Sequence, residues 1–195
     1  FATIQDIHAI KRQINAHRGG DTISVEGHNV KLGRGGIREV EFFAQTQQLI
    51  WGGKHPELRE IRTEDALRMF ANKGLIADST ATELIDAYWY LRKVEHRLQM
   101  IADQQTHEIP LDKEGLHHIA TFLGNKNVDE FRETLTGHLI TVEEHYAQLF
   151  VLLLPVWILA LYFSETSSAR FRKNRIVLNY LKVSGLMLGF TLAIL

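Results

Sequence analysis

Apolar residues recur every three or four positions along most of the first 150 residues, the spacing that one buried helix face requires. This pattern predicts helices over residues 1–18, 36–51, 63–73, 80–101, 112–123 and 131–149. Glycines follow several of these stretches, as expected at helix C-termini, where glycine adopts the left-handed conformation without strain. The connections are short, so neighbouring helices should run antiparallel. We therefore predict a mainly α fold, an antiparallel helical bundle.

One stretch near the N-terminus departs from the helical spacing. Apolar residues alternate with polar ones at Ile23 and Val25, and again at Val30 and Leu32, on either side of residues 27–29 (Gly-His-Asn). Alternation with a period of two is typical of half-buried strands, and glycine next to such runs favours a tight turn. The sequence therefore predicts a small β-hairpin at this point.

The pattern changes again after Phe150. Residues 151–195 contain 28 hydrophobic residues in 45 and five basic residues against one acid, whereas residues 1–150 carry 17 basic and 22 acidic residues. The run from 176 to 195 is 20 residues long, enough to span a bilayer, and a basic cluster precedes it. Two interpretations stay open: a membrane-associated segment, or an apolar tail that is foreign to the domain or frameshifted. The abrupt change favours the second, and we divide the chain into residues 1–150 and 151–195.

The composition excludes several function classes. The chain has no cysteine, which rules out disulfide bonds and thiolate metal sites and fits a reducing, cytoplasmic compartment. The formal net charge is −1, so no excess of basic residues indicates a nucleic-acid partner. The histidines show no zinc-binding spacing, and no nucleophile motif is present. We therefore predict neither a metal site nor a catalytic residue within this chain.

The stretch KLGRGGIREVEFF, residues 31–43, holds the first set of candidate site residues. Glycines before a helix are able to present backbone N–H groups to phosphate, and the helix dipole favours an anion there. The stretch nevertheless fits neither the P-loop pattern nor the dinucleotide-binding pattern. Glu39 and Glu41 diverge by about 200° on a helix, which argues against a shared metal site. Arg38 and Glu41 share a face, either as a solvated ion pair or as ligand-binding groups.

A second polar cluster lies in the predicted helix over residues 80–101. Arg92, Glu95, His96 and Gln99 fall on one wide polar face of that helix. Such a face is either a solvated surface or a polar network between helices. Histidine and glutamine are unusual choices for solubility alone, so the polar network stays open beside the solvated surface.

Four segments, taken in order, carry a family resemblance. They are IKRQI (residues 10–14), VKLGRGGIREVEFFAQTQQLIWGG (30–53), LRKVEHRLQMIADQQTH (91–107) and HYAQLF (145–150). Together they resemble the bifunctional glutamine synthetase adenylyltransferase/adenylyl-removing enzyme family. The resemblance covers essentially all of residues 1–150, and residues 151–195 match nothing in the family. Because the chain starts inside a predicted helix, we expect it to be a fragment of a longer protein.

The resemblance implies an enzyme with two nucleotidyltransferase domains, each followed by a helical domain. In such an enzyme one domain transfers AMP from ATP to a tyrosine of glutamine synthetase, and the N-terminal domain removes it by phosphorolysis, which yields ADP. PII signal protein and glutamine regulate the balance in that family. The present segment resembles the helical region that follows the N-terminal, deadenylylating domain. Its partners would then include glutamine synthetase, PII protein and the missing nucleotidyltransferase domains.

One departure from the family bears on activity. The nucleotidyltransferase signature, a Gly-Ser turn followed by an Asp-x-Asp pair that holds Mg²⁺, is absent from this sequence. We therefore expect the chain alone to be inactive and to bind neither Mg²⁺ nor ATP or ADP. The residues expected to position phosphate or the adenylylated partner are Arg34, Gly35, Gly36, Arg38 and Glu41. The alternatives are a non-catalytic module that binds PII protein and a variant anchored to a membrane through residues 176–195.

Overall fold

The computed structural model describes residues 23–102 and 105–166, with side chains described for all of these except 102 and 150–166. Helices occupy most of this backbone: α2 (Ile37–Trp51), the 3-10 helix η1 (Pro56–Leu58), α3 (Thr63–Asn72), α4 (Asp78–Ala102), α5 (Lys113–Leu123) and α6 (Val128–Thr166). The mainly α fold is thus confirmed. The helix predicted over residues 1–18 lies outside the described residues.

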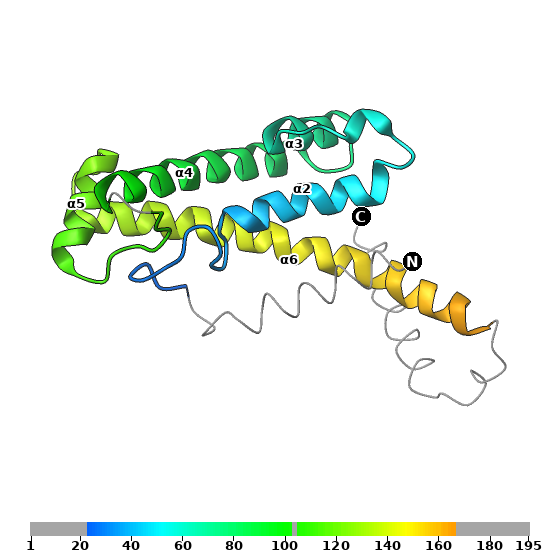
Figure 1. Ribbon diagram of the computed structural model, residues 1–195. Coiled ribbons are helices and arrows are strands. Elements are labelled where there is room, and N and C mark those ends of the chain that lie inside the picture. Colours follow the sequence, from blue (N-terminus) through cyan, green and yellow to red (C-terminus); the bar gives the residue numbers. More distant parts are fainter. Residues whose placement is uncertain (1–22, 103–104, 167–195) are drawn as a thin grey trace.

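The three longest helices form the body of the bundle (Figure 1). Helices α2 and α6 run in one direction, and α4 runs antiparallel to both, with each of the three in contact with the other two. At one end α3 packs on α2 and α4, whereas at the other end α5 packs on α4 and α6. Short connections between the elements impose this up-and-down order.

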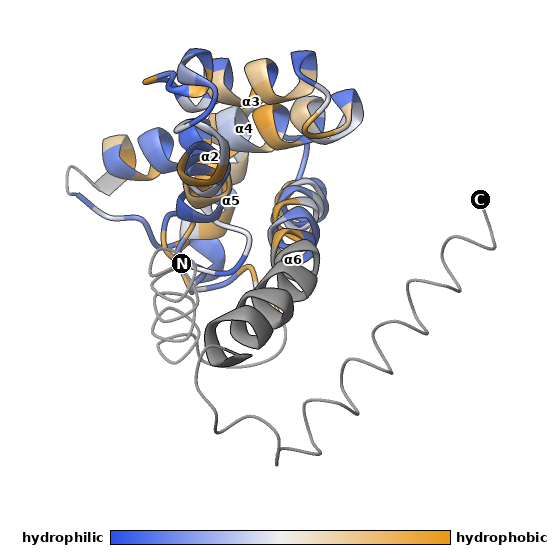
Figure 2. Cartoon of the chain, turned by 90° about the vertical axis from the view of Figure 1, so that its right-hand side faces the viewer, coloured by the Kyte–Doolittle hydropathy of each residue, from blue (hydrophilic) through white to orange (hydrophobic). Residues whose placement is uncertain are grey.

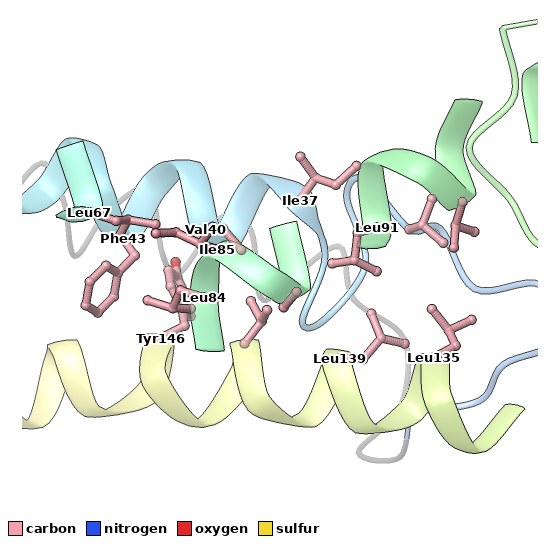
Figure 3. Close-up of a cluster of buried hydrophobic side chains, with 14 of the residues drawn as sticks. Ile37, Val40, Phe43, Leu67, Leu84, Ile85, Leu91, Leu135, Leu139 and Tyr146 are labelled. Atoms are coloured by element: carbon pink, nitrogen blue, oxygen red, sulfur yellow. The ribbon is translucent and has the colours of Figure 1, made fainter. Parts of the chain in front are cut away.

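The apolar stripes that predict the helices meet in one core. Figure 3 shows side chains of α2, α4 and α6 directed toward one another, among them Ile37, Val40, Phe43, Leu84, Leu91, Leu135, Leu139 and Tyr146. All of these are buried, and hydrophobic residues gather on the sides of the helices that face each other (Figure 2). Burying one such side chain contributes about 1.5–3 kcal/mol to folding, so the helices depend on each other for stability.

Local side-chain contacts mark several helix ends. The Asp112 carboxylate accepts a hydrogen bond from Gly115 N at 2.7 Å and caps α5, which ends at Gly124 with a left-handed φ of 87°. At the start of α6, Asn127 Oδ1 accepts from Glu130 N at 2.8 Å, so this helix begins before the predicted residue 131. Capping of this kind satisfies backbone N–H groups that have no partner inside the helix.

The predicted β-hairpin is wrong: residues 23–36 form a series of turns, and no strand is present among the described residues. The backbone of this segment pairs instead with the chain that follows α4. Gly27 N and Val30 N donate to the carbonyl oxygens of Ile109 and His107, at 3.0 and 2.9 Å. Val25 and Val30 are both buried. One residue of each alternating pair therefore contacts the core, whereas Leu32 is exposed. The hydrogen-bonding partners of Gly27 and Val30 come from a distant part of the sequence.

The change of sequence pattern at residue 150 does not coincide with the end of a helix. The backbone of α6 stays helical to Thr166 and includes Pro155, so the structure does not support a separate apolar tail that begins at residue 151. The candidate membrane span at residues 176–195 lies outside the described residues. Within the part that the structure describes, no helix is long and apolar enough to cross a membrane.

Candidate functional site

The glycine-rich stretch forms a tight loop that leads directly into α2. The Asn29 side chain accepts hydrogen bonds from the backbone N–H groups of Lys31 and Leu32, at 3.1 and 2.8 Å. The loop then folds back over the helix start. The N–H groups of Ile37 and Arg38 donate to the carbonyl oxygens of residues 30 and 31, at 3.0 and 3.1 Å. The first N–H groups of α2 are therefore occupied by the chain's own backbone.

Glu39, in the first turn of α2, binds the backbone of this loop through its side chain. Its side chain is 2% exposed, and Oε2 accepts from Gly35 N at 2.6 Å. Gly33 N donates to Asn29 O at 2.7 Å, and Gly36 N donates to Gly33 O at 3.1 Å. The N–H groups of all three glycines thus donate within the chain, and a carboxylate occupies the position that a phosphate takes at such a helix start.

The glycines have a steric role. Gly35 has a φ of 68°, which side-chain-bearing residues rarely adopt, and a Cβ atom built there would lie 2.0 Å from Leu139 O of α6. At Gly36 a Cβ atom would lie 2.8 Å from Val30 O. The loop therefore contacts the backbone of α6 with no side chain between them. Arg34 strengthens this contact through an ion pair with Glu143 of α6.

Arg38 and Glu41, both in the first turns of α2, differ from the loop residues in their side-chain contacts. Arg38 is exposed, and Glu41 is half-buried one turn further along α2. The two do not form an ion pair, and in the described part of the chain neither has a charged partner or a side-chain hydrogen bond. The solvated ion pair, one of the two interpretations of Arg38 and Glu41, is therefore not present. Arg38 thus presents, at the N-terminal end of α2, a guanidinium group that no described residue engages.

The second cluster centres on one buried carboxylate. Glu95 is 2% exposed and lies 2.7 Å from Arg92 Nη1, 3.3 Å from Lys31 Nζ and 3.0 Å from His107 Nδ1. A buried carboxylate is stable only when it is paired in this way. His96 is exposed and Gln99 is half-buried, and neither takes part in these contacts. The network joins the glycine-rich loop, α4 and the segment after α4.

Three residues in these contacts were not predicted from the sequence: Lys31, His107 and Glu143. Lys31 and His107 stand within segments that carry the family resemblance, but no spacing along a single helix relates them to Glu95. Their proximity arises only when the loop and the segment after α4 pair through their backbones. Among the described residues, no group of histidine, aspartate and glutamate side chains has the arrangement to hold a metal ion.

Comparison with known proteins assigns the chain to a family. The family described as GlnD PII-uridylyltransferase matches residues 7–150, which include the glycine-rich loop and the Glu95 network. The chain belongs to this family. Family membership therefore covers α2 to α5 and the part of α6 that packs on them, and the match ends at residue 150.

Individual relatives give a finer comparison. The chain is 57% identical to the bifunctional glutamine synthetase adenylyltransferase/adenylyl-removing enzyme of Rhizobium meliloti (strain 1021). It is 54% identical to the protein of the same name from Rhodopseudomonas palustris (strain TIE-1). Each comparison extends over 150 residues, or 77% of this chain, and the chain spans about 15% of the length of these relatives. The resemblance stated from the sequence is confirmed.

The steric role of Gly35 predicts a large loss of stability on Gly35→Ala. Left-handed strain and the clash with Leu139 should together lower the free energy of unfolding by about 2–4 kcal/mol. Gly53 is a matched control, because a Cβ atom there meets no atom within 4 Å. Gly53→Ala should change the free energy by less than about 0.5 kcal/mol. Urea unfolding of both variants measures the difference, and equal effects would contradict the steric role.

The Glu95 network predicts a comparable loss on Glu95→Ala. Removing the carboxylate leaves Arg92 and Lys31 without their partner in a partly buried site, which should cost about 1–3 kcal/mol. His96→Ala, on the exposed side of the same helix, should stay within about 0.5 kcal/mol of the parent. Thermal or urea unfolding tests both variants. A Glu95→Ala chain as stable as the parent would show that the network is dispensable.

Proposed function

We propose that this chain supplies a helical domain of an enzyme that adenylylates and deadenylylates glutamine synthetase. The observation that carries the proposal is the identity of 57% along 150 residues with a relative whose name states both activities. The chain matches only 15% of that relative, so the proposal assigns the chemistry to other parts of a longer protein. In this role the bundle packs against the deadenylylating nucleotidyltransferase domain and acts in the cytoplasm.

Mg²⁺ and ATP or ADP belong to this proposal as cofactors of the longer enzyme. The described residues of this chain do not fit either group. Within the described ranges no cluster of acidic side chains and histidines suits a metal ion, and the N–H groups of the glycine-rich loop already donate to Glu39 and to backbone carbonyls. We therefore place the Asp-x-Asp metal site in the nucleotidyltransferase domains of the longer enzyme.

Arg38 is the residue that we assign to the domain interface. Arg34 is engaged by Glu143 and Gly35 by Glu39, whereas the Arg38 guanidinium is exposed at the start of α2. A guanidinium group binds phosphate through two parallel hydrogen bonds. In the longer enzyme Arg38 would position phosphate or the adenylylated tyrosine, while Gly35 and Gly36 hold the loop in place. Glu41 lies about one turn further along α2, on the same helix face as Arg38. PII protein would act on this assembly as regulator.

The role of Arg38 is testable in a complete enzyme. Residues 1–150 replace the matching segment of the Rhizobium meliloti relative, and Arg38→Ala is introduced into the chimera. Deadenylylation should fall by about tenfold or more, with the free energy of unfolding unchanged within about 0.5 kcal/mol. Gln45→Ala, at an exposed position further along α2, is the matched control and should leave the rate unchanged. Parallel losses of stability and activity would instead assign Arg38 a structural role.

The chain alone should not catalyse phosphorolysis. Adenylylated glutamine synthetase, inorganic phosphate and Mg²⁺ incubated with the 195-residue chain should release no ADP above the level without protein. The chimera of the preceding test serves as the positive control. Release of ADP that scales with the concentration of the isolated chain would refute the division of labour proposed above.

A further inference from the structure

Six of the eight arginines with described side chains have a carboxylate or carbonyl partner within the chain. Arg34, Arg62, Arg68, Arg92 and Arg132 pair with carboxylates, and Arg59 donates to the carbonyl oxygen of Gly52. Two arginines in this part have neither a carboxylate nor a carbonyl partner. One is Arg38, which is discussed above, and the other is Arg97 near the C-terminal end of α4.

Arg97 differs from an ordinary surface arginine because it is held in place. Its Cζ atom lies 4.5 Å from the centre of the Phe122 ring of α5, and its Nη1 atom lies 3.6 Å from Met100 Sδ. The Nε atom is buried and has no hydrogen-bond partner. Stacking of this kind orients the guanidinium plane while the outer N–H groups stay available for an anion. No carboxylate of the described residues pairs with them.

The surroundings of Arg97 are basic and apolar. Lys93 is exposed one turn earlier on the same helix face and forms no ion pair with any described residue, so two like charges stand four residues apart. The nearest acid in the sequence, Glu95, is 2% exposed and is occupied by Arg92, Lys31 and His107. Met100 is 63% exposed and Phe122 38%. Arg97, which pairs with no described acid, thus lies against two exposed apolar side chains, and Lys93 adds a second positive charge one turn away.

We propose that the basic–apolar patch, formed by Lys93, Arg97, Met100 and Phe122, binds an acidic segment of a partner protein. A carboxylate of that segment would accept hydrogen bonds from the Arg97 guanidinium, and an adjacent apolar side chain would cover Met100 and Phe122. Arginine, methionine and aromatic residues are the types enriched at the centres of protein interfaces. The exposed apolar side chains favour a protein segment over a free inorganic anion, which would leave them in water. The patch lies where α5 crosses the end of α4 (Figure 1).

The test uses the full 195-residue chain with ¹³C-labelled methionine methyl groups, whose Met100 signal is assigned with Met100→Leu. The probe is the peptide acetyl-Leu-Glu-Phe-Glu-Leu-amide, and its matched control carries Gln in place of both Glu residues. The Met100 signal should shift saturably with the acidic peptide. The dissociation constant should be larger by about tenfold or more for the Gln peptide and for Arg97→Ala, whereas Arg62→Ala, at the N-cap of α3, should bind like the parent.

Two further variants keep the result decisive if Arg97→Ala fails to fold. Arg97→Lys retains the charge but loses the planar donor edge, and Phe122→Leu retains apolar cover but loses the aromatic face. Both should weaken binding of the acidic peptide while circular dichroism shows an unchanged helical content. Equal affinity for the two peptides, unchanged affinity in the Arg97 variants, or no shift at millimolar acidic peptide would each overturn the proposal.

Discussion

The contact between the backbones of Gly35 and Leu139 fixes the start of α2 against α6, and much of the bundle depends on it. Because no side chain separates the two backbones, the loop of residues 29–36 is anchored to the helix that it touches. From this anchored loop, Arg34 reaches Glu143 of α6 and Lys31 reaches Glu95 of α4. One short loop therefore connects the three long helices through a close backbone contact and two ion pairs.

The same loop shows why glycines before a helix do not by themselves make a phosphate site. Such a site needs N–H groups that are free to donate. Here Glu39 and the carbonyl oxygens of the loop accept from these groups, so the glycines serve close packing instead. Free donors are found elsewhere, on the Arg38 and Arg97 guanidinium groups. We therefore place the interaction chemistry of this domain on side chains at its surface.

The helices and their core were predictable because burial imposes a period on the sequence. Ile37, Val40 and Phe43 recur at helical spacing, and Asp112 and Gly124 mark the ends of α5, so local rules were sufficient there. The hairpin prediction failed because the alternation of Val25 and Val30 reports burial and not pairing. The N–H groups of Gly27 and Val30 donate instead to carbonyl oxygens about 80 residues further along the chain. The Glu95 network was half predictable: Arg92 shares its helix, whereas Lys31 and His107 arrive from segments that only the tertiary fold brings together.

Amide hydrogen exchange at Gly35 tests the central claim most directly, because it reports whether this N–H group is occupied by Glu39. In the ¹⁵N-labelled 195-residue chain, Gly35 should exchange at least about a hundredfold more slowly than Gly53, and addition of phosphate or ADP should leave both rates unchanged. Exchange of Gly35 as fast as that of Gly53, or protection that appears only when phosphate or ADP is added, would contradict the account. The second result would restore the loop as a phosphate-binding site.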